Sequence, residues 1–114
     1  MGGDYQKLIV WQRSVELVQE IYRLTSKFPS DEKFGLVSQM RRAAVSIPSN
    51  IAEGRMRGSR KDYKRFLYMA IGSGAELETQ IFIAKNLGYL QESLSADRLL
   101  EETMKMLNAL IRSL

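Results

Sequence analysis

The fold is decided in residues 36–51, which read LVSQMRRAAVSIPSNI. Apolar residues recur in this stretch every three or four positions, so that they share one face of a helix. The residues on that face are Leu36, Val37, Met40, Ala43, Ala44, Ile47 and Ile51. Pro48 lies inside the pattern, where a proline removes one backbone hydrogen bond and pushes against the preceding turn. Because the apolar phase continues on both sides of Pro48, the stretch predicts one continuous helix with a kink at this proline.

Helical periodicity extends over the rest of the chain, and no segment shows a sustained strand pattern. The predicted helices run from residue 8 to 27, from 30 or 31 to between 54 and 58, from 60 to 86, and from Ser95 onward. Ser59 and Ser95 are the predicted N-caps of the third and fourth helices, and Gly88 marks the end of the third. Short connections make sequential helices antiparallel neighbours, which predicts an all-α, up-down-up-down four-helix bundle. The length of 114 residues suits a single domain, residues 1–114.

The composition limits the classes of protein and the kinds of site to which this chain can correspond. Apolar residues make up 45% of the chain and charged residues 26%, which is typical of a globular domain. No apolar run approaches the ~18 residues that span a bilayer, and no signal-peptide pattern is present, so no membrane association is expected. Cysteine and histidine are absent, which removes thiolate metal sites, the usual general base at neutral pH and the commonest metal ligand. The sequence therefore predicts a cytoplasmic protein that is not an enzyme, with no catalytic residue, cofactor or metal site.

Positive charge is concentrated in one part of the chain. The net charge is +4, yet residues 41–65 alone carry eight basic and two acidic residues. The eight cations are Arg41, Arg42, Arg55, Arg57, Arg60, Lys61, Lys64 and Arg65. On the third helix, the last four of these share a face with Tyr68, an arrangement that suits phosphate contacts and base stacking. The segment therefore predicts a nucleic-acid-binding surface; an acidic protein partner and an ordinary solvated face are the alternatives.

The third helix carries more apolar surface than one core-facing stripe requires. The surplus residues are Tyr68, Ile71, Ala75 and Phe82. Surplus apolar surface on a small domain usually marks a contact, so these residues predict a homo-oligomer interface. The alternative is a wide stripe that packs between two neighbouring helices of the same chain.

The helical turn around Pro48 also allows two interpretations. Pro48 leaves a backbone carbonyl group without its usual donor, and Ser46 or Asn50 can take part in local hydrogen bonds there. The favoured reading is a structural polar network, and a ligand or partner site is the alternative. Gly72 and Gly74 are best explained by close helix packing, since they lack the strand and third glycine of a nucleotide-binding loop.

Several strings in the sequence carry a resemblance to a known family. They are Val10-Trp11-Gln12-Arg13, Phe28-Pro29, the run from Ser38 to Gly54 that contains Ser-Ile-Pro-Ser-Asn-Ile-Ala-Glu-Gly, and Gly72-Ser73-Gly74-Ala75-Glu76-Leu77-Glu78. In this order they resemble the four-helix-bundle proteins encoded in intervening sequences of bacterial large-subunit (23S) ribosomal RNA genes. That family looks related to the accessory variability protein of diversity-generating retroelements, which assembles with a reverse transcriptase.

The resemblance implies a four-helix bundle, a homopentameric ring and a basic surface that binds RNA or DNA. It supplies no catalytic residues. It marks six signature positions without a chemical role, namely Arg42, Ser46, Pro48, Asn50, Glu53 and Gly54. The resulting expectation is a non-enzymatic, oligomeric binding protein that associates with RNA or DNA through its basic segment. The alternative is a scaffold that binds another protein, such as a polymerase or reverse transcriptase, without touching nucleic acid.

Overall fold

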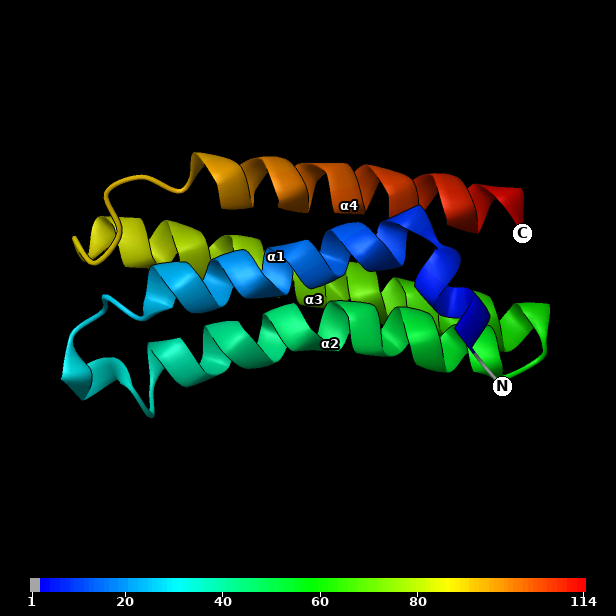
Figure 1. Ribbon diagram of the computed structural model, residues 1–114, viewed down its shortest axis with the longest axis horizontal. Coiled ribbons are helices and arrows are strands. Elements are labelled where there is room, and N and C mark those ends of the chain that lie inside the picture. Colours follow the sequence, from blue (N-terminus) through cyan, green and yellow to red (C-terminus); the bar gives the residue numbers. More distant parts are fainter. Residues whose placement is uncertain (1–2) are drawn as a thin grey trace.

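Four α-helices make up most of the chain (Figure 1). The structure is a computed structural model and describes residues 3–114. The helices are α1 (Ile9–Thr25), α2 (Leu36–Met56), α3 (Arg60–Asn86) and α4 (Leu94–Ser113). Two short 3-10 helices, η1 (Gly3–Lys7) and η2 (Ser30–Glu32), precede α1 and α2. The described residues contain no strand, so the predicted all-α fold is confirmed.

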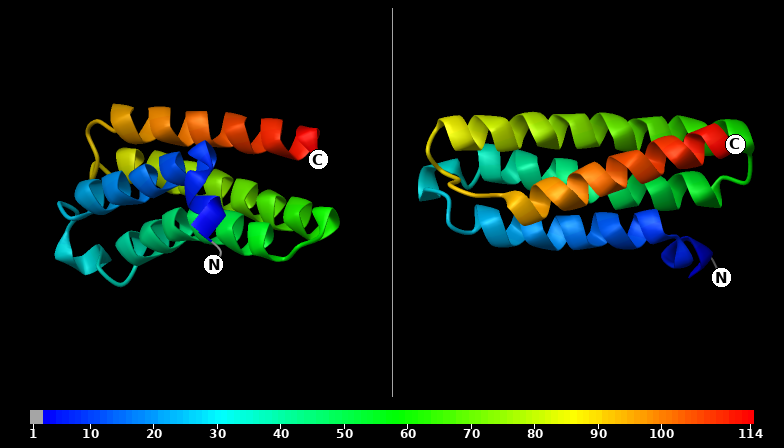
Figure 2. Two further views of the ribbon diagram at one scale, coloured as in Figure 1. Left: turned by 45° about the vertical axis from the view of Figure 1, so that its right-hand side comes forward. Right: turned by 90° about the horizontal axis from the view of Figure 1, so that it is seen from above.

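The four helices lie side by side along the long axis of the molecule. In Figure 1 the ribbon reverses direction from each helix to the next. Helix α1 packs against α2 and α4, and α3 packs against the same two helices. Seen from above, α4 runs obliquely between α1 and α3 (Figure 2). The result is an elongated four-helix bundle that measures 43 × 24 × 20 Å.

The apolar faces predicted from the sequence meet in the centre of this bundle. The largest fully buried apolar side chains are Leu17, Ile21, Met40, Ile47, Ile51, Leu67, Leu77 and Leu107. Each such side chain stabilises the fold by about 1.5–3 kcal/mol relative to an exposed position, before conformational entropy is subtracted. The sequence periodicity therefore accounts for the packing as well as for the helices.

Helix α3 has the bounds expected from its end signals. The Ser59 hydroxyl accepts a hydrogen bond from the backbone N–H of Asp62 at 3.1 Å, which satisfies one of the free donors in the first turn. Gly88 follows the helix with a φ of +80°, the left-handed conformation that glycine adopts without strain. Both ends of α3 could be predicted from the sequence, because helix caps depend on residues that are close in sequence.

The start of α2 and the start of α4 differ from the predictions. Helix α2 begins at Leu36 and not at Ser30 or Asp31, because residues 30–32 form η2 and the chain turns before the helix starts. The Glu32 carboxylate then accepts a hydrogen bond from the backbone N–H of Leu36 at 3.1 Å. Helix α4 begins at Leu94 after Ser93, so the predicted N-cap at Ser95 was wrong.

Helix α2 continues through Pro48 without interruption, and this proline is buried in the core. The side-chain amide of Asn50 donates to the Ser46 carbonyl oxygen at 2.8 Å, while the Ser46 hydroxyl donates to the Ala43 carbonyl oxygen at 2.8 Å. These local bonds support the structural reading of this turn. A kink at Pro48 stays a prediction.

Within the part of the chain that is described, no helix has the length and apolarity needed to cross a membrane.

Candidate nucleic-acid interface

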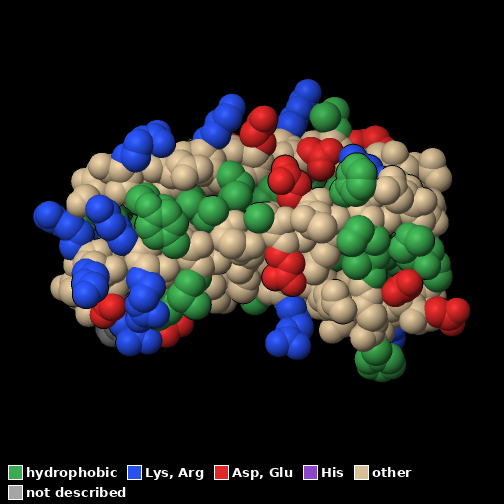
Figure 3. Space-filling view, turned by 180° about the vertical axis from the view of Figure 1, so that it is seen from behind, with side chains coloured by type: hydrophobic (Ala, Val, Ile, Leu, Met, Phe, Trp, Pro, Cys, Tyr) green, Lys and Arg blue, Asp and Glu red, His purple; other side chains and the backbone are tan. Residues whose placement is uncertain are grey.

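Six cations gather where α2 ends and α3 begins. They form a surface that we name the basic end, which consists of Arg55, Arg57, Arg60, Lys61, Lys64 and Arg65. The two helices are joined by residues 57–59, and Gly58 has a φ of +81°, which favours glycine at this position. The tight turn thus places cations from both helices on one end of the bundle. Figure 3 shows basic side chains gathered at that end of the molecule.

Gly54 allows α2 and α3 to approach each other at the basic end. A Cβ atom at position 54 would lie 2.7 Å from the Cβ atom of Phe66 and 3.2 Å from the Tyr63 ring. Such a distance is too short for two carbon atoms, and the first atom belongs to the rigid base of a side chain. The signature glycine is therefore explained by the geometry of this helical hairpin.

Three arginines of the basic end form ion pairs. The pairs are Arg55–Asp4 at 3.3 Å, Arg57–Glu53 at 2.7 Å and Arg65–Asp62 at 3.5 Å between nitrogen and oxygen. The guanidinium groups of Arg57 and Arg65 also lie over the Phe66 ring, at 4.9 and 4.6 Å from its centre. Their neighbours therefore restrict these arginines to positions close to the protein surface.

The other three cations of the basic end have no such partner. Arg60, Lys61 and Lys64 form no ion pair with any residue between positions 3 and 114. Tyr68 lies one helical turn beyond Lys64 and is 59% exposed, so its ring is accessible beside the cations. Charged groups that remain hydrated and unpaired are available for the phosphates of a nucleic acid.

Tyr63 lies beneath the basic end. Burial raises the pKa of its phenol above the usual value, and the positive charge of Arg55 opposes that shift. Tyr63 therefore remains a neutral packing residue at neutral pH.

Residues 3–114 hold no group of three or more acidic side chains placed to bind a metal ion.

Arg41 and Arg42 lie apart from the basic end. Arg42 and Arg55 are 13 positions apart, which corresponds to about 20 Å along α2 at about 1.5 Å per residue. The Arg41 guanidinium lies 4.3 Å from the centre of the Tyr22 ring. It donates hydrogen bonds to the Thr25 hydroxyl at 3.0 Å and to the Tyr22 carbonyl oxygen at 3.3 Å. The eight predicted cations thus form two separate groups.

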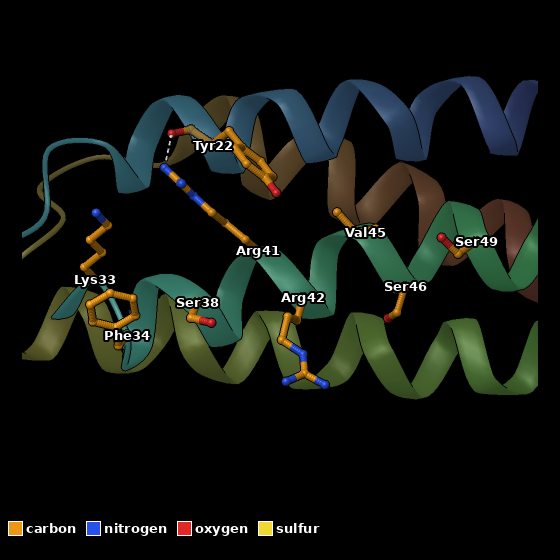
Figure 4. Close-up of a pocket in the computed structure, with 9 residues that line it drawn as sticks. All are labelled: Tyr22, Lys33, Phe34, Ser38, Arg41, Arg42, Val45, Ser46 and Ser49. Atoms are coloured by element: carbon orange, nitrogen blue, oxygen red, sulfur yellow. Dashed lines mark hydrogen bonds between the residues drawn. The ribbon is translucent and has the colours of Figure 1, made fainter.

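The second group borders an open groove that the sequence did not reveal. We name it the α1–α2 groove; it has a volume of about 660 Å³ (Figure 4). Its lining includes Tyr22, Lys33, Phe34, Arg41, Arg42 and Val45. These residues come from three separate segments, and only the packing of α1 on α2 brings them together. The one signal in the sequence was Phe34, an aromatic residue in a connecting segment.

The remaining signature positions have structural surroundings. Pro48 is buried, Ser46 and Asn50 form the hydrogen bonds described above, and Glu53 pairs with Arg57. Arg42 differs from them, because its side chain is exposed and forms no ion pair within residues 3–114. The signature positions other than Arg42 are therefore explained by hydrogen bonds, an ion pair or packing that involve α2.

The four residues predicted to form an oligomer interface lie along α3. Phe82 is 65% exposed, Ala75 and Tyr68 are also exposed, and Ile71 is half-buried against the core. Figure 3 shows hydrophobic side chains on this side of the molecule, over α3 and α4. Ile71 contributes to both the core and the surface, and the role of all four residues as an interface stays a prediction.

Comparison with known proteins identifies the family of this chain. No curated protein matches the chain. Residues 6–109 match the family of the 23S rRNA-intervening sequence protein, a span that includes α1, α2, α3, most of α4 and all of the basic end. The match covers nearly the whole length and confirms the resemblance drawn from the signature strings. The chain therefore belongs to the 23S rRNA-intervening sequence protein family.

Proposed function

We propose that this protein is a non-enzymatic nucleic-acid-binding protein that contacts RNA or DNA through the basic end. The observation that carries the proposal is the group of three cations, Arg60, Lys61 and Lys64, that no carboxylate within residues 3–114 neutralises. Their charge lies on the first two turns of α3, which the turn at Gly58 connects to the end of α2. A surface of this kind attracts a polyanion.

The physical basis of binding is the release of counterions from phosphate groups. Each phosphate that a lysine or arginine neutralises on a single strand contributes about 0.7 to the slope of log K against log salt concentration. Phosphate contacts of this kind carry no sequence information directly. The proposal therefore predicts salt-sensitive binding with weak sequence preference.

The test replaces the unpaired cations. The variant is Arg60→Gln, Lys61→Gln, Lys64→Gln, and the probes are fluorescein-labelled single strands of RNA and DNA, observed by fluorescence anisotropy. Loss of three phosphate contacts lowers the salt slope by about 2 and weakens binding about fifty-fold near 0.15 M salt. Arg60 and Lys61 are exposed and Lys64 is half-buried, and none of the three forms an ion pair within residues 3–114, so the variant is expected to fold like the parent.

The control separates the site from the overall charge. The variant Arg98→Gln, Lys105→Gln, Arg112→Gln removes the same charge from α4, where all three side chains are exposed. It is expected to retain most of the affinity and most of the salt slope. If both triple variants lose affinity equally, or if the α3 variant binds like the parent, the basic end is not the site.

A second proposal concerns assembly. We propose that the chain forms a homo-oligomer, for which the family resemblance suggests a pentamer, through Tyr68, Ile71, Ala75 and Phe82. Its support is the exposure of Phe82 on a helix whose opposite face already fills the core. The variant Phe82→Asp is expected to yield monomers in multi-angle light scattering. A parent protein that is monomeric at micromolar concentration contradicts the proposal.

A further inference from the structure

We propose that the α1–α2 groove binds an acidic amphipathic helix of a partner protein. The groove lies near the end of the bundle opposite the basic end, beside the connection that leads from α1 through η2 into α2 (Figure 4). This proposed site is separate from the proposed nucleic-acid site, because it uses different residues and a different kind of contact.

The shape of the groove suits a helix. Two helices that pack side by side leave a lengthwise depression between their outer faces, and a third helix can lie in it. The lining follows α2 from Ser38 to Ser49, which corresponds to about 16 Å at about 1.5 Å of rise per residue. A partner helix of about three turns therefore matches the length of the groove.

The floor and edge of the groove offer apolar side chains to that helix. Phe34 is 90% exposed, the most exposed of the large hydrophobic residues described, while Tyr22 and Val45 are 43% and 39% exposed. Large aromatic side chains that remain in water are typical of surfaces that bind other proteins. Phe34 is placed to act as an anchor between the apolar residues of a partner.

The charge of the groove defines the chemistry of the partner. Lys33, Arg41 and Arg42 line it, and none of its described lining residues is acidic. Arg41 extends towards α1 and Arg42 projects on the other side of α2, so positive charge flanks the apolar strip on both sides (Figure 4). A helix with carboxylates on both sides of an apolar face complements this arrangement, and a basic helix does not.

A peptide suits this groove better than a nucleic acid does. The Arg41 guanidinium covers one face of the Tyr22 ring at 4.3 Å, and two of its donor groups already bind Thr25 and Tyr22. Neither side chain is therefore free for base stacking or for a bidentate phosphate contact. The remaining accessible surface is mainly apolar, which favours the apolar face of a helix.

The test uses synthetic probes. The first is a fluorescein-labelled peptide of about 18 residues, long enough to form a stable helix on binding, with Leu at positions i, i+3, i+4 and i+7 and Glu at most other positions. Two control peptides replace Glu by Lys or shuffle the Leu positions. Saturable binding of the first peptide is expected, with affinities at least about tenfold weaker for both controls.

Variants locate the binding site on the protein. Phe34→Ala is expected to weaken binding of the Glu–Leu peptide about tenfold, because a truncated anchor residue commonly has an effect of this size. Arg42→Glu weakens it further by repulsion. Leu87→Ala is the matched control, since it truncates an apolar side chain that is 54% exposed and lies outside both the groove and the predicted oligomer interface, and it leaves the affinity within about twofold of the parent.

Several results overturn the inference. No saturable binding of the Glu–Leu peptide, equal binding of the Lys–Leu peptide, or an unchanged affinity in Phe34→Ala each rejects the acidic-helix site. If Phe34→Ala instead abolishes binding of labelled RNA, the groove is a nucleic-acid site. The triple Gln variant of the basic end must retain peptide binding, so failure of this inference and failure of the proposed function are distinguishable.

Discussion

The basic end and the α1–α2 groove both carry arginine and lysine, but their surroundings differ. At the basic end Arg60, Lys61 and Lys64 form no ion pair within residues 3–114 and lie close in sequence to other cations. At the groove Arg41 is held by hydrogen bonds and by an aromatic ring, and apolar side chains surround it. The charge of the two regions has the same sign, and only the neighbours distinguish them.

This difference teaches that a count of basic residues does not identify a partner. Hydrated, unpaired cations displace the counterions condensed on a polyanion, and binding of this kind is strongly salt-dependent. Cations that flank apolar surface select an acidic partner whose affinity comes mainly from burial of side chains. The two regions are therefore expected to respond differently to mutation, salt and pH.

The largest expected effect concerns the helical hairpin that builds the basic end. Gly54→Ala places a Cβ atom 2.7 Å from the Phe66 Cβ atom, so the two helices must separate. Overpacking of this kind costs about 1–3 kcal/mol in the free energy of unfolding, which urea denaturation measures. RNA binding is expected to weaken as well, while peptide binding at the groove remains.

The control for this variant is a second helical glycine. A Cβ atom at Gly72 meets no atom within 4 Å, so the close packing predicted for this glycine was wrong, and Gly72→Ala is expected to stabilise α3 by about 0.5–1 kcal/mol. If both alanine variants changed stability in the same direction, close packing would not explain Gly54.

A second prediction contrasts two adjacent arginines. Arg41→Ala removes two hydrogen bonds and the contact with the Tyr22 ring, so it is expected to destabilise the fold by about 1–2 kcal/mol. Arg42→Ala removes an exposed side chain and is expected to change stability by less than about 0.5 kcal/mol. Equal effects in urea denaturation would show that Arg41 is as free as Arg42.

A third prediction concerns independence of the two regions. Saturation with the Glu–Leu peptide is expected to change the RNA affinity by less than about twofold, because the regions lie about 20 Å apart and salt screens charges over about 8 Å at 0.15 M. Anisotropy of labelled RNA with increasing unlabelled peptide measures this coupling. Full competition would place both ligands on one surface.

The smallest expected effect is a change of stability with pH at Glu32, which precedes the groove residue Lys33 in the chain. The Tyr89 hydroxyl donates to the Glu32 carboxylate at 3.0 Å, which attaches η2 to the segment that follows α3. This bond raises the pKa of Tyr89 above its usual value of 10.0. Its stabilisation is present below about pH 10 and is lost as the pH rises through the raised pKa.

Tyr89→Phe is therefore expected to lower stability slightly at pH 8 and to show a smaller loss of stability above pH 10 than the parent. Urea denaturation at a series of pH values measures the difference between the two proteins. Parallel curves would mean that the tyrosine hydroxyl contributes nothing that depends on ionisation.

Local signals in the sequence predicted much of the fold. The bounds of α3 followed from Ser59 and Gly88, because caps depend on residues within one turn. The start of α2 could not be predicted, since the Glu32 carboxylate that caps it acts across a turn with a particular shape. The short helix η1 was also missed, because five residues give no periodicity to detect.

The candidate sites were predicted less completely. The basic end could be found because its cations are close in sequence as well as in space. Arg41 and Arg42 were grouped with it for the same reason, although about 20 Å of helix separates them from Arg55. The α1–α2 groove could not be found, since Tyr22 and Arg41 become neighbours only when α1 packs on α2.

The continuity of α2 through Pro48 has a consequence for how the two regions act together. One continuous helix runs between them, so a helix bound in the groove and a nucleic acid bound at the basic end would lie about 20 Å apart. A single partner that carries both an acidic helix and a nucleic acid gains avidity only if its own geometry spans this separation. The distance between the two regions would therefore select among partners that carry both kinds of ligand.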